Sequence, residues 1–407
     1  MHKRFYWTLT FLLALSITFI ADRSFSQQNV SAQIKERWQM QSKKAETAGL
    51  AEAFRGITTN GTVQPGLFKI KSSGVSTAPV KKAADEYLAS LSAQQRTRTK
   101  FPLDDDEWRK WMNQHFYIRQ GVSLSEMDEA QRGKAIGLIK ASLSARGLKL
   151  SEDIMKLNYT LGEINNNDFE QYGDLFYWIT IMGEPSATEP WGWQVDGHHL
   201  IINYFVMGDQ VVMSPAFFGS EPVIAKAGKY KGIEILQLEQ KMGLELVRSL
   251  DDGQKSKAVL NVSKTGNNNV GEAFKDNVVL DYAGLRVSDM NAAQKKALLA
   301  LAERYVGNMD NGHAKVRMSE VESHLKDTYF AWIGGTADNS VFYYRVHSPV
   351  VLLEFDHQNP ANLRHLAANP NVPERSHVHA TLRTPNGNDY GKDLLRQHYL
   401  LHPHGQN

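Results

Sequence analysis

The sequence predicts an α+β fold in which two related helix–helix–antiparallel-hairpin halves, the products of an internal duplication, pack into one body. First, 42% of the 407 residues are apolar and 10% are aromatic, which is enough to build a large core. Second, segments with helical periodicity lead into antiparallel strand patterns. Third, the same order of signals returns once, roughly 150–165 residues later, and this period is too long for a solenoid.

The N-terminal residues 1–26 are predicted to be a signal peptide. A short basic head precedes an apolar run from Phe5 to Ala21, and Ser24 and Ser26 are the small residues that a signal peptidase reads. The alternative is an uncleaved membrane anchor, but this run spans only about 26 Å as a helix, less than a hydrocarbon core of roughly 30 Å. We therefore expect an exported protein, periplasmic or extracellular, with no stable membrane span after cleavage.

The charge and the cysteine content exclude several classes of protein. The chain has 46 basic and 44 acidic side chains, and removal of residues 1–26 leaves 43 of each. A neutral chain without a run of Lys or Arg lacks the cationic surface that nucleic acids bind, so no nucleic-acid partner is expected. The absence of cysteine excludes disulfides, thiolate metal sites and a cysteine nucleophile.

Residues 27–75 are expected to form a peripheral helix and strand, and residues 76–225 the first half. Apolar residues from Val80 to Leu91 recur at helical spacing. Ser125 to Asp128 has the pattern of a capping box, in which a serine hydroxyl accepts from a free backbone N–H one turn further on. An apolar stripe from Ala135 to Leu143 continues behind it.

The second half, residues 226–400, repeats these signals, and residues 401–407 form a tail. The matched segments, in chain order, are Ser90-Leu91 with Ser249-Leu250, Gly121–Arg132 with Gly284–Lys295, and Phe176–Ile179 with Tyr329–Ile333. Three matches in the same order favour a duplication over two capping boxes that are alike by chance.

Each half is predicted to end in strands. The strand segments are Trp191–Tyr204 and Gln210–Met213 in the first half, and Val341–Asp356, broken at Ser348-Pro349, and His377–Arg383 in the second.

Two histidines on one predicted strand are the main candidates for chemistry. Side chains alternate along a strand, so His377 and His379 point to the same face, a few ångströms apart. This geometry suits two nitrogen ligands on one metal ion. Glu354 and Asp356 have the same spacing at the end of an apolar strand, where a buried charge needs a partner or a metal.

His198-His199 is the third element of the predicted site. Neighbouring strand residues face opposite ways, which places His199 on the apolar face and His198 on the polar face. The Gly-His-His sequence occurs in the first half, and the Glu354 carboxylate occurs in the second. We therefore expect a site at the junction of the two halves.

Structural interpretations of the same residues stay open. A His-X-His strand is commonly a surface pair or part of a hydrogen-bonded network, and Glu354 could pair with Arg345 or Arg383. Trp191 and Trp193 are expected in the core rather than as a stacking platform for a sugar. No nucleophile elbow, Walker loop, nucleotide or flavin fingerprint or H-E-x-x-H motif occurs, whereas glycoside hydrolysis by two carboxylates stays open.

An ordered set of motifs runs through most of the chain after residue 26. It comprises Trp191-Gly192-Trp193, Gly197-His198-His199-Leu200, Pro215–Gly219, Tyr343-Tyr344-Arg345, Glu354-Phe355-Asp356, His377-Val378-His379, Arg383-Thr384-Pro385, Asp389–Leu395 and His398-Tyr399. Taken together, these motifs resemble the bacterial family known as domain of unknown function 3500. The resemblance implies no catalytic role for any residue, because the family carries no assigned activity.

The leading hypothesis is an exported metal-dependent enzyme, with a hydrolase favoured because no redox cofactor motif occurs. The expected metal ligands are His377, His379, Glu354 and His199, and nitrogen and oxygen donors of this kind admit zinc, iron, manganese or copper. The expected catalytic residues are His198 or His199 as a general base, Asp356 to orient an imidazole, and Arg345 and Arg383 to hold an anionic small-molecule substrate.

The alternative hypothesis is a non-catalytic periplasmic or extracellular binding protein. Its histidines and carboxylates would form a buried polar network, and Trp191, Trp193 and Tyr344 would line a cleft.

Overall fold

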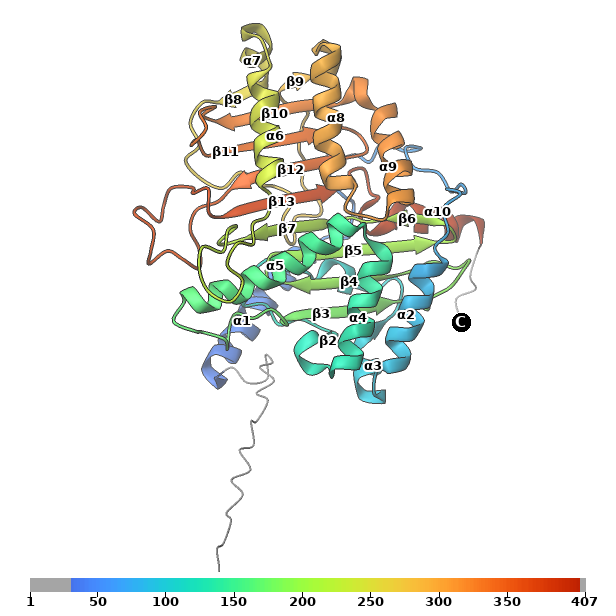
Figure 1. Ribbon diagram of the computed structural model, residues 1–407. Coiled ribbons are helices and arrows are strands. Elements are labelled where there is room, and N and C mark those ends of the chain that lie inside the picture. The colour runs from blue at the N-terminus through green and yellow to red at the C-terminus, as the bar shows by residue number, and fades with distance from the viewer. Residues whose placement is uncertain (1–30, 403–407) are drawn as a thin grey trace, which may run out of the picture.

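A computed structural model describes residues 31–402 of the chain (Figure 1). The predicted signal segment, residues 1–26, lies outside the described residues, as does most of the predicted tail. A single sheet of 13 strands runs through the molecule, and most of the helices lie against one face of it (Figure 1). The predicted α+β class is therefore confirmed.

Ten strands follow one another across the sheet in the order β1-β3-β4-β5-β7-β13-β12-β11-β10-β8. Their bounds are β1 Lys100–Phe101, β3 Tyr177–Met182, β4 Trp191–Gly197, β5 Leu200–Met207, β7 Ala216–Ser220, β8 Val259–Asn261, β10 Tyr329–Gly334, β11 Phe342–His347, β12 Leu352–His357 and β13 Val378–Arg383. Three short strands pair beside this path: β2 (Val122–Ser123) with β3, β6 (Gln210–Val212) with β5, and β9 (Leu285–Arg286) with β10.

The helices precede or follow these strands in the chain. Their bounds are α1 Ala32–Gly49, α2 Ala78–Ser90, α3 Ala93–Thr99, α4 Glu129–Ser142, α5 Ala145–Ile164, α6 Gln237–Arg248, α7 Asp252–Ala258, α8 Ala292–Val306, α9 Asn311–Ser323 and α10 Lys392–Leu401. Figure 1 shows α2, α4, α5, α6, α8 and α9 across the front of the sheet. None of the helices within residues 31–402 is both long enough and apolar enough to cross a bilayer.

The predicted helices and hairpins occur close to their expected bounds, but one cap is shifted. Asp128 accepts from the backbone N–H of Gln131 and thereby caps α4. Ser123, not Ser125, forms a second box with Glu126 around a single 3-10 turn. The prediction at Ser125 was wrong because two overlapping caps fall within six residues, and sequence alone does not fix which serine adopts the extended backbone that a cap needs.

The two halves of the sheet have the same arrangement of strands: from each edge, one short parallel strand is followed by four strands that pair antiparallel. The antiparallel pair β7 and β13 lies in the middle, and each outer flank ends in a short parallel strand, β1 on β3 and β8 on β10. Leu143, which follows α4, and Met309, which follows α8, form an antiparallel bridge to one another. Strands from both halves of the chain therefore meet at the centre of one continuous sheet.

The segment between α1 and α2 differs from its prediction. Residues 27–75 were expected to supply a helix and a strand, and α1 is that helix. The segment after α1 adds no strand to the sheet, and Thr58 forms only an isolated bridge with Val279. This segment runs over the face of the sheet opposite the helices, where Phe68 joins a small apolar cluster with Phe217 of β7.

The two faces of the sheet differ in chemistry. Val378, Ala380 and Leu382 of β13 belong to the main apolar core under the helices. The alternate residues of the same strand, including His379 and Arg383, point to the opposite face, which loops cover together with α10. We call these the helix face and the loop face.

Candidate metal centre

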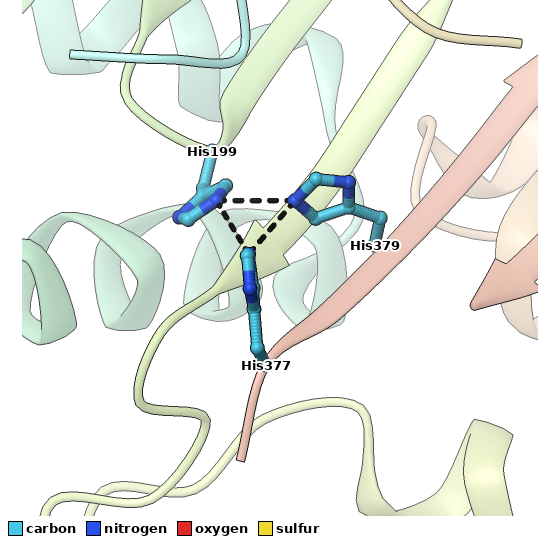
Figure 2. Close-up of side chains that lie close together, drawn as sticks. All are labelled: His199, His377 and His379. Atoms are coloured by element: carbon cyan, nitrogen blue, oxygen red, sulfur yellow. Dashed lines mark hydrogen bonds between the residues drawn. The ribbon is translucent and has the colours of Figure 1, made fainter. Parts of the chain in front are cut away.

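Three imidazoles meet at the loop face, at the end of the sheet where β4 turns into β5 (Figure 2). The Nε2 atoms of His377 and His379 are 3.0 Å apart, and the Nε2 atom of His199 lies 3.4 Å from the first and 3.2 Å from the second. All three side chains are buried. A tetrahedral zinc ion with bonds of about 2.0–2.1 Å requires ligand nitrogens about 3.3 Å apart, so the triangle has the size that one ion needs.

Hydrogen bonds at the outer nitrogens fix the tautomers of two of these rings. The Nδ1 atom of His377 lies 2.7 Å from the carbonyl oxygen of Asn359, and a carbonyl can only accept, so this nitrogen carries the proton. The Nδ1 atom of His379 lies 2.8 Å from a carboxylate oxygen of Glu272. Both Nε2 atoms are then unprotonated, and their lone pairs face each other across 3.0 Å. A bound cation stabilises such an arrangement.

The electrostatic setting also favours the neutral imidazoles that metals bind. Burial lowers the pKa of His199 and of His379 well below the ordinary value, and the neighbouring imidazoles lower it further. A proton is therefore a weak competitor for these nitrogens at neutral pH.

His199 reaches the site because it lies in a turn and not on a strand. β4 ends at Gly197 and β5 begins at Leu200, so His198 and His199 form the two-residue connection. His199 has a φ of 62°, a left-handed conformation that is uncommon for a residue with a side chain and is often retained at functional sites. The expectation that strand alternation would separate the two rings was wrong, because alternation does not apply within a turn.

His198 lies outside the triad and supports it. Its ring stacks on that of His199 with centroids 4.1 Å apart, and its Nδ1 atom lies 2.7 Å from the side-chain oxygen of Asn158. The residue thus packs behind a triad ring instead of adding a ligand.

Glu354 and Asp356, the expected ligand and orienting acid, do not join the triad. Glu354 accepts from the backbone N–H groups of Val270 and Gly271 and from two side-chain hydroxyls, on Tyr343 and Thr381. These bonds satisfy its buried carboxylate completely. The assignment as a metal ligand is therefore corrected.

Asp356 has a similar role two residues further along β12. It accepts from the backbone N–H groups of Asn268 and Asn269 and pairs with Lys264 at 2.6 Å. Together the two acids hold the loop of residues 264–272 against the sheet, and no imidazole is among the hydrogen-bond partners that the described residues give them.

That loop carries an acid at the triad that the sequence did not indicate. Glu272 directly follows the clamped Gly271 and bonds His379. Its side chain is 23% exposed, so the triad lies close to solvent on this side. Two buried acids in mid-strand were a signal that some segment must satisfy them, but nothing in the sequence shows that this segment carries Glu272.

The two arginines expected to hold a substrate form hydrogen bonds and ion pairs with other residues of the protein. Arg383 is fully buried and pairs with Asp276 at 2.7 Å and with Asp389 at 2.8 Å. Arg345 is also buried and donates to the carbonyl of Asp281. Among the described residues, no hydrogen bond or ion pair joins either guanidinium to a triad histidine or to Glu354, so both roles are corrected.

The aromatic residues that the binding hypothesis assigned to a cleft are core residues. Trp191, Trp193 and Tyr344 are completely buried in the apolar core of the helix face. This confirms the expectation of core positions for the two tryptophans.

The comparisons with known proteins identify a family and no activity. A family model described as "Protein of unknown function (DUF3500)" matches residues 73–392, well over half of the chain. The chain therefore belongs to this family. No match was found among curated proteins or among solved structures.

Proposed function

We propose that this member of the DUF3500 family is a metal-dependent enzyme, with a hydrolase favoured, whose ion is bound by His199, His377 and His379. Three histidine ligands with a fourth position left for water or substrate form a common type of catalytic zinc site. Iron, manganese and copper also accept imidazole, so the donor set leaves the choice of metal to measurement.

A single observation carries the proposal. Three Nε2 atoms lie within 3.4 Å of one another. The Nδ1–H groups of two of the rings already donate hydrogen bonds to Asn359 and Glu272. A hydrogen-bonded histidine network would normally place a proton between neighbouring nitrogens. Here a cation accounts for the geometry better than a proton does.

The residues around the triad have distinct roles in this proposal. Glu272 accepts the His379 proton, which fixes that tautomer and makes Nε2 a stronger donor to a metal. The Asn359 carbonyl does the same for His377. A divalent ion in such a site polarises a carbonyl or phosphoryl group and lowers the pKa of a water molecule that it binds. Hydrolysis needs no further cofactor, which is why it is favoured.

Metal analysis of protein purified without a histidine tag tests the proposal. We expect about one equivalent of one transition metal by inductively coupled plasma mass spectrometry, and its loss in the H377A/H379A double variant with the circular dichroism spectrum retained. H365A, which removes an exposed histidine from a loop, is the matched control and should keep the metal. Failure of every candidate ion to bind after reconstitution would leave the non-catalytic binding protein as the better hypothesis.

Activity is a separate measurement on the metal-loaded protein. Panels of esters, amides and phosphoesters should reveal a hydrolytic reaction that the double variant lacks. If the metal-loaded protein were inactive on all of them but turned over a redox substrate, an oxidoreductase would replace the hydrolase as the proposed function.

We also propose that the chain is exported after cleavage of residues 1–26, on the basis of the sequence pattern alone. N-terminal sequencing of the protein from its native host should begin at Gln27. A protein that starts at Met1 and stays with the membrane would favour the anchor.

We further propose that the two halves arose by duplication. The side-chain pair Gln95 and Gln131 in the first half recurs as Gln254 and Gln294 in the second, each glutamine bonding its partner and a backbone carbonyl. The symmetric strand order supports the same origin. Alignment of residues 76–225 with residues 226–400 across family members should score above shuffled sequences, and a score no better than shuffled ones would count against it.

A further inference from the structure

A cavity of about 540 Å³ lies beside the triad but separate from it. It is bounded by the C-terminal end of α5, the loop after β7 and the loop that leads into β13. Ser376 lines the cavity and directly precedes His377, whereas none of the three imidazoles lines it. The volume falls within the range of roughly 300–1,000 Å³ that is usual for small-molecule sites.

The apolar side of the cavity wall is held in place by a buried acid. Ile164, Val223 and Leu363 are among the residues that line it. Glu221, which is 2% exposed, accepts hydrogen bonds from the backbone N–H groups of residues 361, 362 and 363 and so fixes the loop that presents Leu363. Hydrogen bonds therefore fix this wall, although part of the loop of residues 361–363 is exposed to solvent.

Two cations at the cavity form no ion pair with a carboxylate of the described residues. Lys226 is exposed, and Arg375 is half-buried and gives one N–H to the carbonyl of Ser340. No carboxylate within residues 31–402 lies in ion-pair distance of either. The carboxylate of Asp338 acts on Arg375 electrostatically, but it forms its ion pair with Arg248, at 2.7 Å. A half-buried guanidinium that has no ion-pair partner favours the binding of an anion.

The one acid of the wall is turned away from these cations. Glu163 accepts the backbone N–H of Lys229 at 3.0 Å, and its other oxygen is shielded from solvent against Gly228. Its carboxylate thus holds the start of the turn at Gly228 and Lys229 and makes no ion pair with Lys226 or Arg375. The cavity keeps an excess of positive charge over an aliphatic wall.

We propose that this cavity binds a small organic carboxylate with an aliphatic body, its carboxylate on Arg375 and Lys226 and its chain against Ile164, Val223 and Leu363. The binding does not depend on a metal in the triad, so this inference goes beyond the proposed function. The chain of the ligand supplies affinity through buried apolar area, and the two cations select the charged end.

Isothermal titration calorimetry with decanoate, below its micelle concentration, tests the inference on the full-length mature protein with and without added metal. We expect one site per chain in both states. Decanamide should bind at least tenfold more weakly because it lacks the charge. Butyrate should bind far more weakly, since each buried methylene contributes about a fourfold factor in affinity.

Variants of the cavity separate this site from unspecific binding of a fatty acid. R375Q and K226Q should each weaken decanoate binding about tenfold, while K231Q, which removes an exposed lysine outside the cavity, should leave it unchanged. Unchanged thermal unfolding of each variant shows that the fold is retained. Equal binding of decanoate and decanamide, several equivalent sites, no binding, or no effect of R375Q would each overturn the inference.

Discussion

The helix face and the loop face of the sheet are built from the same strands, yet they are stabilised in different ways. On β12, Leu353 and Phe355 point into an apolar core under the helices, and Glu354 and Asp356 point to the loops. A helix has already used most of its backbone N–H groups internally, whereas a loop still has them to donate. A face rich in buried acids therefore needs a cover of loops, and that cover brings Glu272 to the triad.

The largest difference between the faces should be seen when a buried charge loses its partner. Arg383→Met on the loop face leaves the buried carboxylate of Asp389 without its cation and leaves Asp276 with Arg109 alone. We expect a loss of about 3–5 kcal/mol in the free energy of unfolding, measured by urea denaturation at pH 7. A loss below about 1 kcal/mol would mean that the loop face does not depend on its ion pairs.

An apolar truncation on the helix face should cost somewhat less and respond differently to salt. Leu353→Ala removes a completely buried side chain and should cost about 2–4 kcal/mol, through lost transfer free energy and a cavity. Because no charge is involved, the cost should be the same at low and high salt. A loss that changed with ionic strength would contradict the view that apolar packing alone stabilises the helix face.

Loss of the acid behind His379 should affect metal affinity and leave the fold intact. Glu272→Gln removes a carboxylate that accepts the His379 proton and should weaken metal binding by about 10–100-fold, measured by competition with a chelator. The free energy of unfolding of the metal-free protein should change by less than about 0.5 kcal/mol, since the side chain is partly exposed. An unchanged metal affinity would remove Glu272 from the proposed site.

Glu354→Gln is the informative control for that variant. It disturbs the clamp on residues 270 and 271 and should lower both metal affinity and stability. If Glu354→Gln reduced metal affinity while stability stayed at the wild-type value, a direct role for Glu354 at the metal would have to be considered again.

The smallest expected effect is a pH dependence of the free energy of unfolding that arises from Glu107. Burial raises the pKa of Glu107 to about 9, and the carboxylates of Asp196 and Asp105 add to the shift against the opposing effect of Lys110. The folded protein then keeps a proton that the unfolded chain loses near pH 4.5, so this residue lowers stability as the pH rises from about 4.5 to 9.

Glu107→Gln should remove that loss. Relative to wild type, the variant should gain about 1–2 kcal/mol in the free energy of unfolding between pH 5 and pH 8, measured by urea denaturation at both values. The same gain at both pH values would point to better packing rather than to the loss of an ionisable group.

Local patterns predicted the elements of the fold well. Periodicity placed α2 and the strands β4, β5, β11, β12 and β13, because a helix or strand with one buried face must repeat its apolar residues at a fixed spacing. The same period of two predicted that His377 and His379 share a face, and they do.

The sequence by itself determined the α+β class, the pairing of His377 with His379 and the presence of buried acids on β12, since each follows from short-range spacing. Only the tertiary structure decided that a turn brings His199 to those rings and that Glu354 holds a loop instead of a metal. It also decided that Glu272 orients His379, a residue 107 positions further along the chain. Such contacts depend on which loop covers which face, and short-range periodicity carries no information about partners so far apart.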